Sequence, residues 1–281
     1  MNVNEKEVVV LVGAGQIGQA MARRVGSGRH IVLADVKQEH ADRAAKVLEN
    51  TGFKTSTLAV DISSRSSIFA LIDHAKQFGA IKYLINAAGV SPSQASIETI
   101  LKVDLYGTAV LLAEFGKVIE AGGSGIIISS QSGHRLGALP PKETDQLAMT
   151  PTEELLELPF LKAIQDTLKA YQYSKRCNVL RVMAEAAKWG KRGATVNSIS
   201  PGIVITHLAN DELNGPRKDG YRKMLSLSPA GRAGTPDEIG DLAEFLMSHK
   251  GRFISGSDIL IDGGTTASYW FGDLQYLKET H

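Results

Sequence analysis

The chain has 281 residues, 43% of them hydrophobic, which is enough to bury one large α/β core. Its 31 basic and 30 acidic residues are mixed along the sequence, which excludes the basic surface needed for nucleic acid or an anionic membrane. The single cysteine excludes an internal disulfide, and no His or Cys cluster has metal-site spacing. Because the sequence also lacks a signal-peptide pattern and a long apolar run, we expect a cytoplasmic protein that binds no metal.

Short β-branched runs alternate with amphipathic helical windows along almost the whole chain. Strands are predicted at 8–12, 31–35, 54–60, 83–87, 125–130, 194–200 and 258–262, and helices at 16–26, 39–51, 66–79 and 166–190. This alternation is typical of repeated βαβ units around a parallel sheet. We therefore predict an α/β fold, a doubly wound parallel sheet of about seven strands with helices on both faces, as one domain over residues 1–281.

Two regions interrupt this alternation, and connections of such length are usually functional or disordered. Residues 137–167 contain several prolines, and part of this region, 151–169, is predicted to be helical. We expect an insertion near the active site that covers the substrate cleft, alters a subunit contact, or is a solvent-exposed decoration. Residues 203–235 are predicted to be a substrate-binding loop. The aromatic stretch 268–281 is predicted to pack on another subunit or near the substrate entrance.

The first predicted strand runs into a G-x-G-x-x-G turn, which is typical of dinucleotide binding. The turn and the start of the following helix contain Gly13, Gly15, Gln16, Ile17 and Gly18. The glycines permit a tight turn and close approach of the backbone to a pyrophosphate, which the helix N-terminus attracts. A plain βα connection is the alternative.

Asp35 closes the second predicted strand, about twenty residues after the turn, where a carboxylate accepts hydrogen bonds from the adenosine ribose. The same negative charge repels a 2′-phosphate, so NAD is favoured over NADP. Lys37 lies nearby and could accommodate that phosphate, or could be a solvated charge at a helix start.

Tyr171 and Lys175 lie one turn apart on a predicted helix, which places a phenol and an ammonium on the same face. An ammonium about 4 Å away favours the phenolate by about 1 kcal/mol in bulk water but by about 4 kcal/mol at an effective dielectric constant of about 20. The pair is therefore expected to act as a general acid/base only in a partly dehydrated cleft. Ser130 ends a predicted strand at the ligand-binding edge of the sheet, with Ser129 and Ser132 as alternatives.

Taken together, these features resemble the short-chain dehydrogenase/reductase family over nearly the whole chain. The resemblance is carried by "DIS" (61–63), "NAAG" (86–89), "IIISSQSG" (126–133), "YQYSK" (171–175), "NSISPGIVIT" (197–206), "GRAGTPDEI" (231–239) and "ISGSDILIDGG" (254–264). It implies a Rossmann fold and an NAD(P)-dependent oxidoreductase that moves hydride between the nicotinamide and a carbinol or carbonyl carbon. It also implies a homodimer or homotetramer.

The resemblance further implies that Tyr171 is the general acid/base, that Lys175 stabilises its phenolate and binds the nicotinamide ribose, and that Ser130 holds the substrate oxygen. The remaining cofactor contacts that it implies are Asp61 and Ile62 at the adenine, Asn86, Ala87, Ala88 and Gly89 along the cofactor, and Pro201, Gly202, Val204 and Thr206 at the nicotinamide.

The chain departs from the family pattern in three places. The glycine turn is one residue shorter than usual. Asp104 stands where the family has an asparagine that relays protons towards the lysine. It could still offer its backbone carbonyl to a water, or its carboxylate could pair with Lys175, and we keep it as a catalytic candidate. Ser130 and Tyr171 are 41 positions apart, against about a dozen in most relatives. Some bacterial hydroxysteroid dehydrogenases and carbonyl reductases resemble the chain in carrying such an insertion.

We therefore expect hydride transfer between NAD(H) and a secondary alcohol or ketone, with hydroxysteroid-like substrates as a subset. Reduction of 3-oxoacyl thioesters and oxidation of sugar alcohols are alternatives, although no concentrated basic patch for an acidic carrier protein is evident. A non-catalytic nucleotide-sensing protein is the rival from another class, and the presence of both Tyr171 and Lys175 argues against it.

Overall fold

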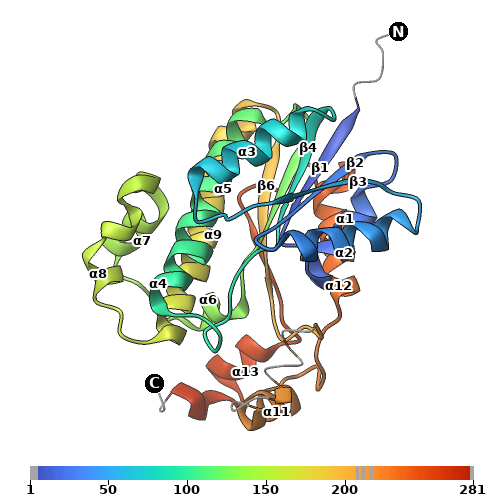
Figure 1. Cartoon of the computed structure of the whole chain (residues 1–281). Helices are drawn as coiled ribbons and strands as arrows, with labels where there is room; N and C mark the ends of the chain where they lie inside the picture. Colours follow the sequence, from blue (N-terminus) through green and yellow to red (C-terminus); the bar gives the residue numbers. More distant parts are fainter. Residues whose placement is uncertain (1–5, 207–208, 210–212, 215–217, 279–281) are drawn as a thin grey trace.

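The computed structural model describes residues 6–206, 209, 213–214 and 218–278, and its centre is a single parallel sheet (Figure 1). The strand order is β3-β2-β1-β4-β5-β6-β7. The strands are β1 (Glu7–Val12), β2 (His30–Asp35), β3 (Lys54–Ala59), β4 (Ala80–Asn86), β5 (Ser124–Ile128), β6 (Thr195–Pro201) and β7 (Asp258–Ile261). The predicted doubly wound sheet is confirmed, because each predicted strand overlaps an observed one.

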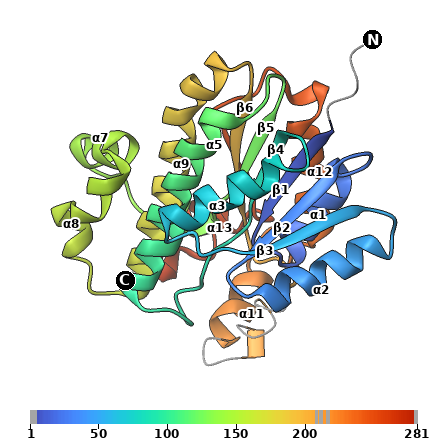
Figure 2. The same cartoon turned by 45° about the horizontal axis from the view of Figure 1, so that its top comes forward.

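Helices cover both faces of the sheet, as Figures 1 and 2 show. The helices are α3 (Arg65–Lys76), α5 (Thr108–Val118) and α9 (Thr167–Lys191) on one face, and α1 (Gln16–Val25), α2 (Gln38–Glu49) and α12 (Pro236–Met247) on the other. Each layer has its own apolar core, and alternate residues of β1 contribute to the two cores. Val8–Val12 is therefore buried on both sides, which explains why it reads as a continuous apolar run.

The strand order reverses between β1 and β4, and the loops that follow these two strands meet at the carboxyl edge of the sheet. Gly13, in the first loop, has a φ of 87°, and a Cβ there would lie 2.4 Å from the backbone nitrogen of Ala88 in the second loop. Only glycine allows the two backbones to approach so closely. Ligands of open α/β sheets bind at such a reversal point.

Shorter elements lie around this edge and along the flank of α9, except η3, which connects α12 to β7. They are α4 (Ile97–Ile100), the π-helix η1 (Leu101–Gly107), α6 (Gln131–Arg135), α7 (Pro141–Met149), the 3₁₀ helix η2 (Thr152–Glu157), α8 (Pro159–Lys162), α11 (Lys218–Ser226), the 3₁₀ helix η3 (His249–Gly251), α13 (Thr265–Phe271) and the 3₁₀ helix η4 (Gln275–Lys278). No helix among the described residues has the length and apolar character required to cross a membrane.

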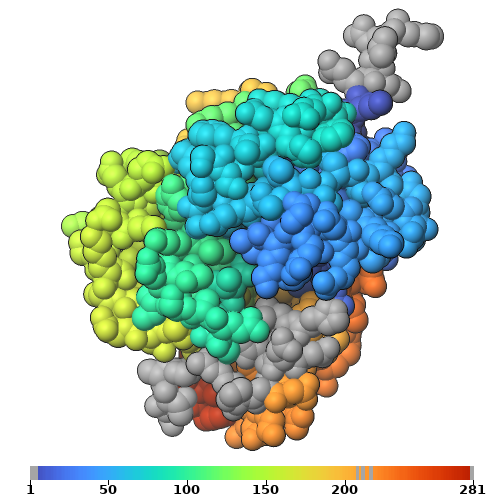
Figure 3. All heavy atoms as spheres, viewed as in Figure 1, coloured from blue at the N-terminus to red at the C-terminus, as the bar shows by residue number. Residues whose placement is uncertain are grey.

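The predicted insertion, 137–167, contains α7, η2 and α8 and packs along α9 (Figure 1). In Figure 3 its yellow-green atoms form the left side of the molecular surface. Leu147, Leu155 and Leu161 are buried in a third apolar core together with residues of α9. Arg181 of α9 donates a hydrogen bond of 2.6 Å to the carbonyl oxygen of Leu147. The insertion is thus an integral layer of the fold, and its description as a solvent-exposed decoration is wrong.

The predicted helical stretch 151–169 is divided into separate pieces. Pro159 begins α8, because proline lacks the N–H that a helix interior needs. Asp166 has an extended backbone and accepts a hydrogen bond from the backbone N–H of Lys169 at its side chain, so that it caps the start of α9.

We expect Leu147→Ala to lower the free energy of unfolding by about 2–5 kcal/mol, because a fully buried leucine would be replaced by a cavity. Urea unfolding at a fixed protein concentration measures the change. Met149→Ala is the matched control on the same helix, since Met149 is 69% exposed and should change stability by about 0.5 kcal/mol or less. Equal effects of the two substitutions would contradict the packing of the insertion.

Candidate active site

A cavity of about 660 Å³ opens at the carboxyl edge of the sheet. It contains many of the residues that the sequence predicted to bind cofactor or substrate. These are Ile17, Ala87, Ala88, Gly89, Ser130, Tyr171, Lys175, Pro201, Gly202, Val204 and Thr206. Five separate segments of the chain therefore meet around one space.

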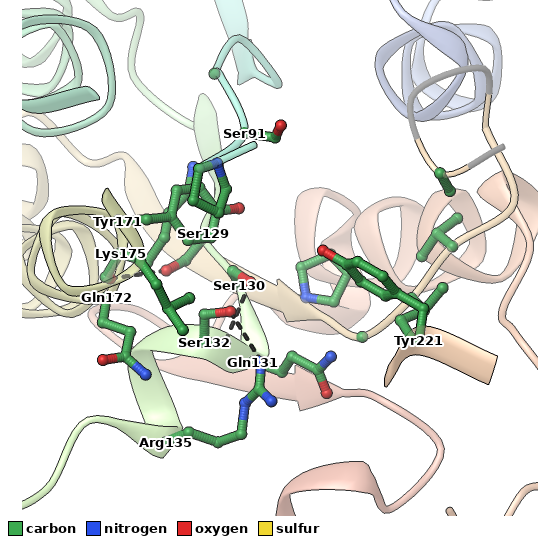
Figure 4. Close-up of a pocket in the computed structure, with 18 of the residues that line it drawn as sticks. Ser91, Ser129, Ser130, Gln131, Ser132, Arg135, Tyr171, Gln172, Lys175 and Tyr221 are labelled. Carbon is green, nitrogen blue, oxygen red and sulfur yellow. Dashed lines mark hydrogen bonds between the residues drawn. The ribbon is translucent and has the colours of Figure 1, made fainter. Parts of the chain in front are cut away.

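Tyr171 and Lys175 reach this cavity from the first turns of α9 (Figure 4). The Nζ atom of Lys175 lies 5.3 Å from the centroid of the Tyr171 ring, and the Lys175 residue is only 4% exposed. The ammonium is therefore held in a site shielded from water beside the phenol. In such a site a charge acts far more strongly than it does at the surface.

Three serines follow β5, and their hydrogen bonds distinguish them. The Oγ atom of Ser129 donates to the carbonyl oxygen of Lys175 at 2.8 Å, so this hydroxyl joins β5 to α9. Ser132 Oγ accepts a hydrogen bond from Arg135 at 3.1 Å. Ser130 Oγ accepts one from the backbone N–H of Ser132 at 3.1 Å, which fixes the hydroxyl at the start of α6 and leaves its hydrogen for donation.

Asp104 lies beneath the cavity on η1, with its side chain fully buried. Its Oδ1 atom accepts a hydrogen bond from the backbone N–H of Val90 at 3.0 Å and lies 3.8 Å from Lys175 Nζ. The carboxylate therefore pairs with the ammonium, one of the two roles considered from the sequence. A Cβ at Gly89 would lie 2.7 Å from the same Oδ1 atom, so glycine is required where this loop crosses the pair.

Burial raises the pKa of Asp104 to about 6, although Lys175 and the Val90 N–H both favour the charged form. Burial alone would lower the pKa of Lys175, but the charges of Asp104 and Tyr171 together raise it. Lys175 is therefore a cation throughout the neutral range, and Asp104 becomes an anion as the pH rises through about 6.

The glycine turn and Asp35 form a second part of the site, outside the lining of the cavity. Asp35 Oδ2 accepts a hydrogen bond from the backbone N–H of Ala14 and Oδ1 accepts one from that of Lys37, both at 3.1 Å. Gly15 begins α1 without a side-chain cap, and a Cβ there would have no atom within 4 Å. The chemistry of these residues suits a dinucleotide, because the backbone N–H groups of the turn can bind phosphate and the carboxylate can bind a ribose.

Several other predicted contacts also lie outside the cavity lining. They are Gly13, Gln16, Gly18, Asp61, Ile62 and Asn86, together with the catalytic candidate Asp104. Asn86 is 1% exposed; its amide nitrogen donates to Thr108 Oγ1 and its oxygen accepts from the backbone N–H of Ala88, both at 3.2 Å. This side chain holds the loop after β4 in shape and does not line the cavity. Asp61 binds Ser63 through its Oδ1 atom.

The sequence did not predict four further polar residues of the cavity lining, Gln131, Arg135, Gln172 and Tyr221. Their only local signal was proximity in sequence to Ser130, to Tyr171 or to the predicted loop 203–235. Residues 207–208, 210–212 and 215–217 of that loop lie outside the described residues. The C-terminal stretch was predicted to pack near the substrate entrance or on another subunit, and its Tyr269 and Leu277 line the cavity. No group of three or more His, Cys, Asp or Glu within the described ranges could hold a metal ion.

Comparisons with known proteins cover almost the whole chain. The family model described as "short chain dehydrogenase" matches residues 6–139, and the related model described as "Enoyl-(Acyl carrier protein) reductase" matches residues 148–266. A short-chain dehydrogenase/reductase, bsc3, of Alternaria brassicicola is 36% identical over 93% of this chain and 96% of its own. A D-threitol dehydrogenase of Mycolicibacterium smegmatis is 32% identical, over 93% of each chain.

A solved short-chain dehydrogenase/reductase from Serratia marcescens superposes with a TM-score of 0.73 at 22% identity, over 93% of this chain and 98% of that one. This likeness supports the fold that the sheet order already indicated. The two family models and the extended sequence similarity carry the assignment further: the chain belongs to the short-chain dehydrogenase/reductase family of NAD(P)-dependent oxidoreductases.

Proposed function

We propose that this dehydrogenase transfers hydride between NAD(H) and a secondary alcohol or ketone, with Tyr171, Lys175 and Ser130 as its catalytic residues. The observation that carries the proposal is the buried Lys175 ammonium, 5.3 Å from the ring centroid of Tyr171 at the wall of the cavity. Membership of the family supports the reaction class.

In the oxidative direction, the Tyr171 oxygen takes the proton of the substrate hydroxyl, and Lys175 stabilises the phenolate that does so. The Ser130 hydroxyl donates a hydrogen bond to the substrate oxygen and orients it. The bound nicotinamide supplies the hydride acceptor. In the reductive direction the proton returns from Tyr171 to the oxygen of the ketone.

Asp104 changes the electrostatic effect of Lys175 on the Tyr171 phenol. As an anion 3.8 Å from Lys175 Nζ, it offsets part of the positive charge that favours the phenolate. Because its charge develops as the pH rises through about 6, the effect is present at neutral and alkaline pH and disappears in acid. We therefore propose that Asp104 is a positioning residue that acts through Lys175.

NAD is the proposed cofactor, with NADP disfavoured. Both Asp35 oxygens are fixed by backbone N–H groups, so the carboxylate is held at the end of β2. In that place it can accept hydrogen bonds from the ribose hydroxyls and repel a 2′-phosphate. Asp61 and Ile62 are the proposed adenine contacts.

The substrate is proposed to lie between Ser130 and the two irregular regions of the chain. Asp166 of the insertion and Tyr221 and Met224 of the predicted loop line the cavity. Sugar alcohols are the second candidate class, since the similar D-threitol dehydrogenase is named for one. Polar lining residues such as Gln131 favour these over bulky apolar hydroxysteroids.

We also propose a homodimer or homotetramer. Phe253 is fully exposed and Phe271 is 88% exposed, and a subunit contact would remove such apolar side chains from water. A cytoplasmic location stays a prediction from the sequence.

Tyr171→Phe should lower kcat for alcohol oxidation by about 10²–10⁴-fold, because the proton acceptor is removed. Reduced nicotinamide absorbance measures turnover over a panel of secondary alcohols, and calorimetry measures NAD binding, which should persist. Tyr173→Phe on the same helix is the matched control, since that hydroxyl contacts Glu143 outside the cavity lining. Undiminished turnover by Tyr171→Phe would end the catalytic assignment and favour a nucleotide-sensing role.

Asp104→Asn should move the midpoint of the kcat/KM–pH profile for alcohol oxidation to lower pH, by on the order of one unit. The neutral amide no longer offsets the charge of Lys175, so the phenolate forms more readily. Below about pH 6 the wild-type and Asp104→Asn profiles should have the same slope, because the wild-type Asp104 is then also neutral. Asp73→Asn, an exposed change on α3, is the control, and a midpoint that stays in place in both variants would remove Asp104 from the mechanism.

Asp35→Asn should reduce the preference for NAD over NADP, measured as the ratio of kcat/KM values, by about tenfold or more. The amide oxygen can still accept from the N–H of Ala14, so the turn is retained while the charge that repels the 2′-phosphate is lost. An unchanged ratio would show that Asp35 does not select the cofactor.

A further inference from the structure

Arg135, at the end of α6, extends its guanidinium into the cavity beside Ser130 and Ser132 (Figure 4). One terminal nitrogen donates to Ser132 Oγ at 3.1 Å, and the other lies 3.8 Å from the Sδ atom of Met224. The Nε atom is buried and has no hydrogen-bond partner among the described residues. A strongly donating group therefore has one hydroxyl and one thioether as its hydrogen-bond acceptors.

Gln131, one helical turn earlier, also has a buried polar atom without a hydrogen-bond partner among the described residues. Its Nε2 atom also lies 3.8 Å from Met224 Sδ, and its buried Oε1 atom has no partner in the part of the chain that the structure describes. Thioether sulfur is a weak acceptor, yet two polar side chains converge on it. Buried polar groups are normally satisfied, and exceptions in a cavity indicate that a ligand completes them.

The positive charge of Arg135 also has no ion-pair partner within the described part of the chain. No carboxylate in the described ranges lies within 4 Å of its guanidinium, and Asp262 accepts hydrogen bonds from the backbone N–H groups of Gly264 and Thr266. Burial lowers the pKa of Arg135, although Tyr269, Tyr221, Asp262 and Tyr171 act in the opposite direction. The guanidinium nevertheless keeps its charge, because arginine does not lose its proton in proteins.

The neighbouring Arg176 shows what a structural arginine in this region looks like. It donates to the backbone carbonyl oxygens of Gly133 at 3.0 Å and Leu136 at 2.9 Å, and it does not line the cavity. Among the described residues, Arg135 donates no hydrogen bond to a backbone carbonyl oxygen. Packing alone therefore does not account for its guanidinium; Tyr269 lies 5.7 Å from it, ring centroid to Cζ, as an aromatic wall.

We infer that Arg135 and Gln131 form a receptor for an oxyanion group carried by the substrate, next to the place where Ser130 and Tyr171 hold the reacting oxygen. An oxyanion accepts two parallel hydrogen bonds from a guanidinium and would replace Met224 Sδ as the acceptor. The inference rests on the proposed function and narrows it to secondary alcohols or ketones that bear an acidic group, such as hydroxy acids and oxo acids. Arg135 is then a residue that determines specificity.

The test is a calorimetric titration of the cofactor-saturated enzyme with cyclohexanecarboxylate, cyclohexanesulfonate and cyclohexanecarboxamide. None of these has a carbinol, so binding is measured without turnover. We expect at least one of the two anions to bind about tenfold or more tightly than the amide, because charge-assisted hydrogen bonds are the stronger ones. Comparing the two anions shows whether the receptor prefers a planar carboxylate or a tetrahedral sulfonate.

In Arg135→Met the anion and the amide should bind about equally tightly, so that the preference for the anion is lost. Arg135→Lys should retain part of this preference. The control is Arg222→Met, an exposed change on α11 that removes the same charge outside the cavity lining and should keep the preference. The inference is overturned if the wild-type enzyme binds the amide as tightly as both anions, or if Arg135→Met keeps the preference. The wild-type comparison stands even if the variants do not fold.

Failure of the proposed function gives a different result. A lack of turnover with every secondary alcohol and ketone would refute hydride transfer, while the titrations would still report whether the receptor binds an oxyanion.

Discussion

The buried positive charge of Lys175 is the interaction on which the arrangement of the site depends. A charge removed from water is costly unless nearby groups of opposite or polarisable character compensate it. Asp104 provides the opposite charge at 3.8 Å and the Tyr171 ring lies on another side. Gly89 lets the loop after β4 close over this pair. Burial of the Lys175 ammonium costs free energy of folding, and it also strengthens the effect of this charge on the Tyr171 phenol. The same buried charge therefore affects both stability and chemistry.

The sheet places this charge at its carboxyl edge, where open α/β sheets bind their ligands. The loops after β1 and β4 meet where the strand order reverses, and Gly13 lets their backbones approach closely. Ser130 leaves β5 at the same edge, and Ser129 ties that strand to α9 through the Lys175 carbonyl. The Ser129 hydroxyl therefore links the sheet to α9. This link holds Ser130 at a fixed distance from Tyr171 and Lys175.

The insertion adds a further constraint on α9. Its leucines and the hydrogen bond from Arg181 hold α7 against the middle of the helix, while Asp166 caps the first turn just ahead of Tyr171. The segment thus helps to fix where α9 begins, and with it the position of the phenol. On α6, which packs beside α9, Arg135 and Gln131 present polar groups whose hydrogen bonding is incomplete among the described residues. In the proposed site, Arg135 and Gln131 select the substrate, while Tyr171 and Lys175 transfer the proton.

The sequence by itself determined the sheet, the glycine turn, the Tyr171–Lys175 pair and the family, because these depend on local periodicity and on short ordered motifs. It could not determine which way a buried side chain points. Only the tertiary structure decided that Asp104 pairs with Lys175, that the insertion is packed and broken at Pro159, and that Asn86 supports a loop. It also decided that Arg135 faces the cavity while Arg176 faces the backbone. Contacts between residues distant in sequence settle such questions, and a single sequence does not record them.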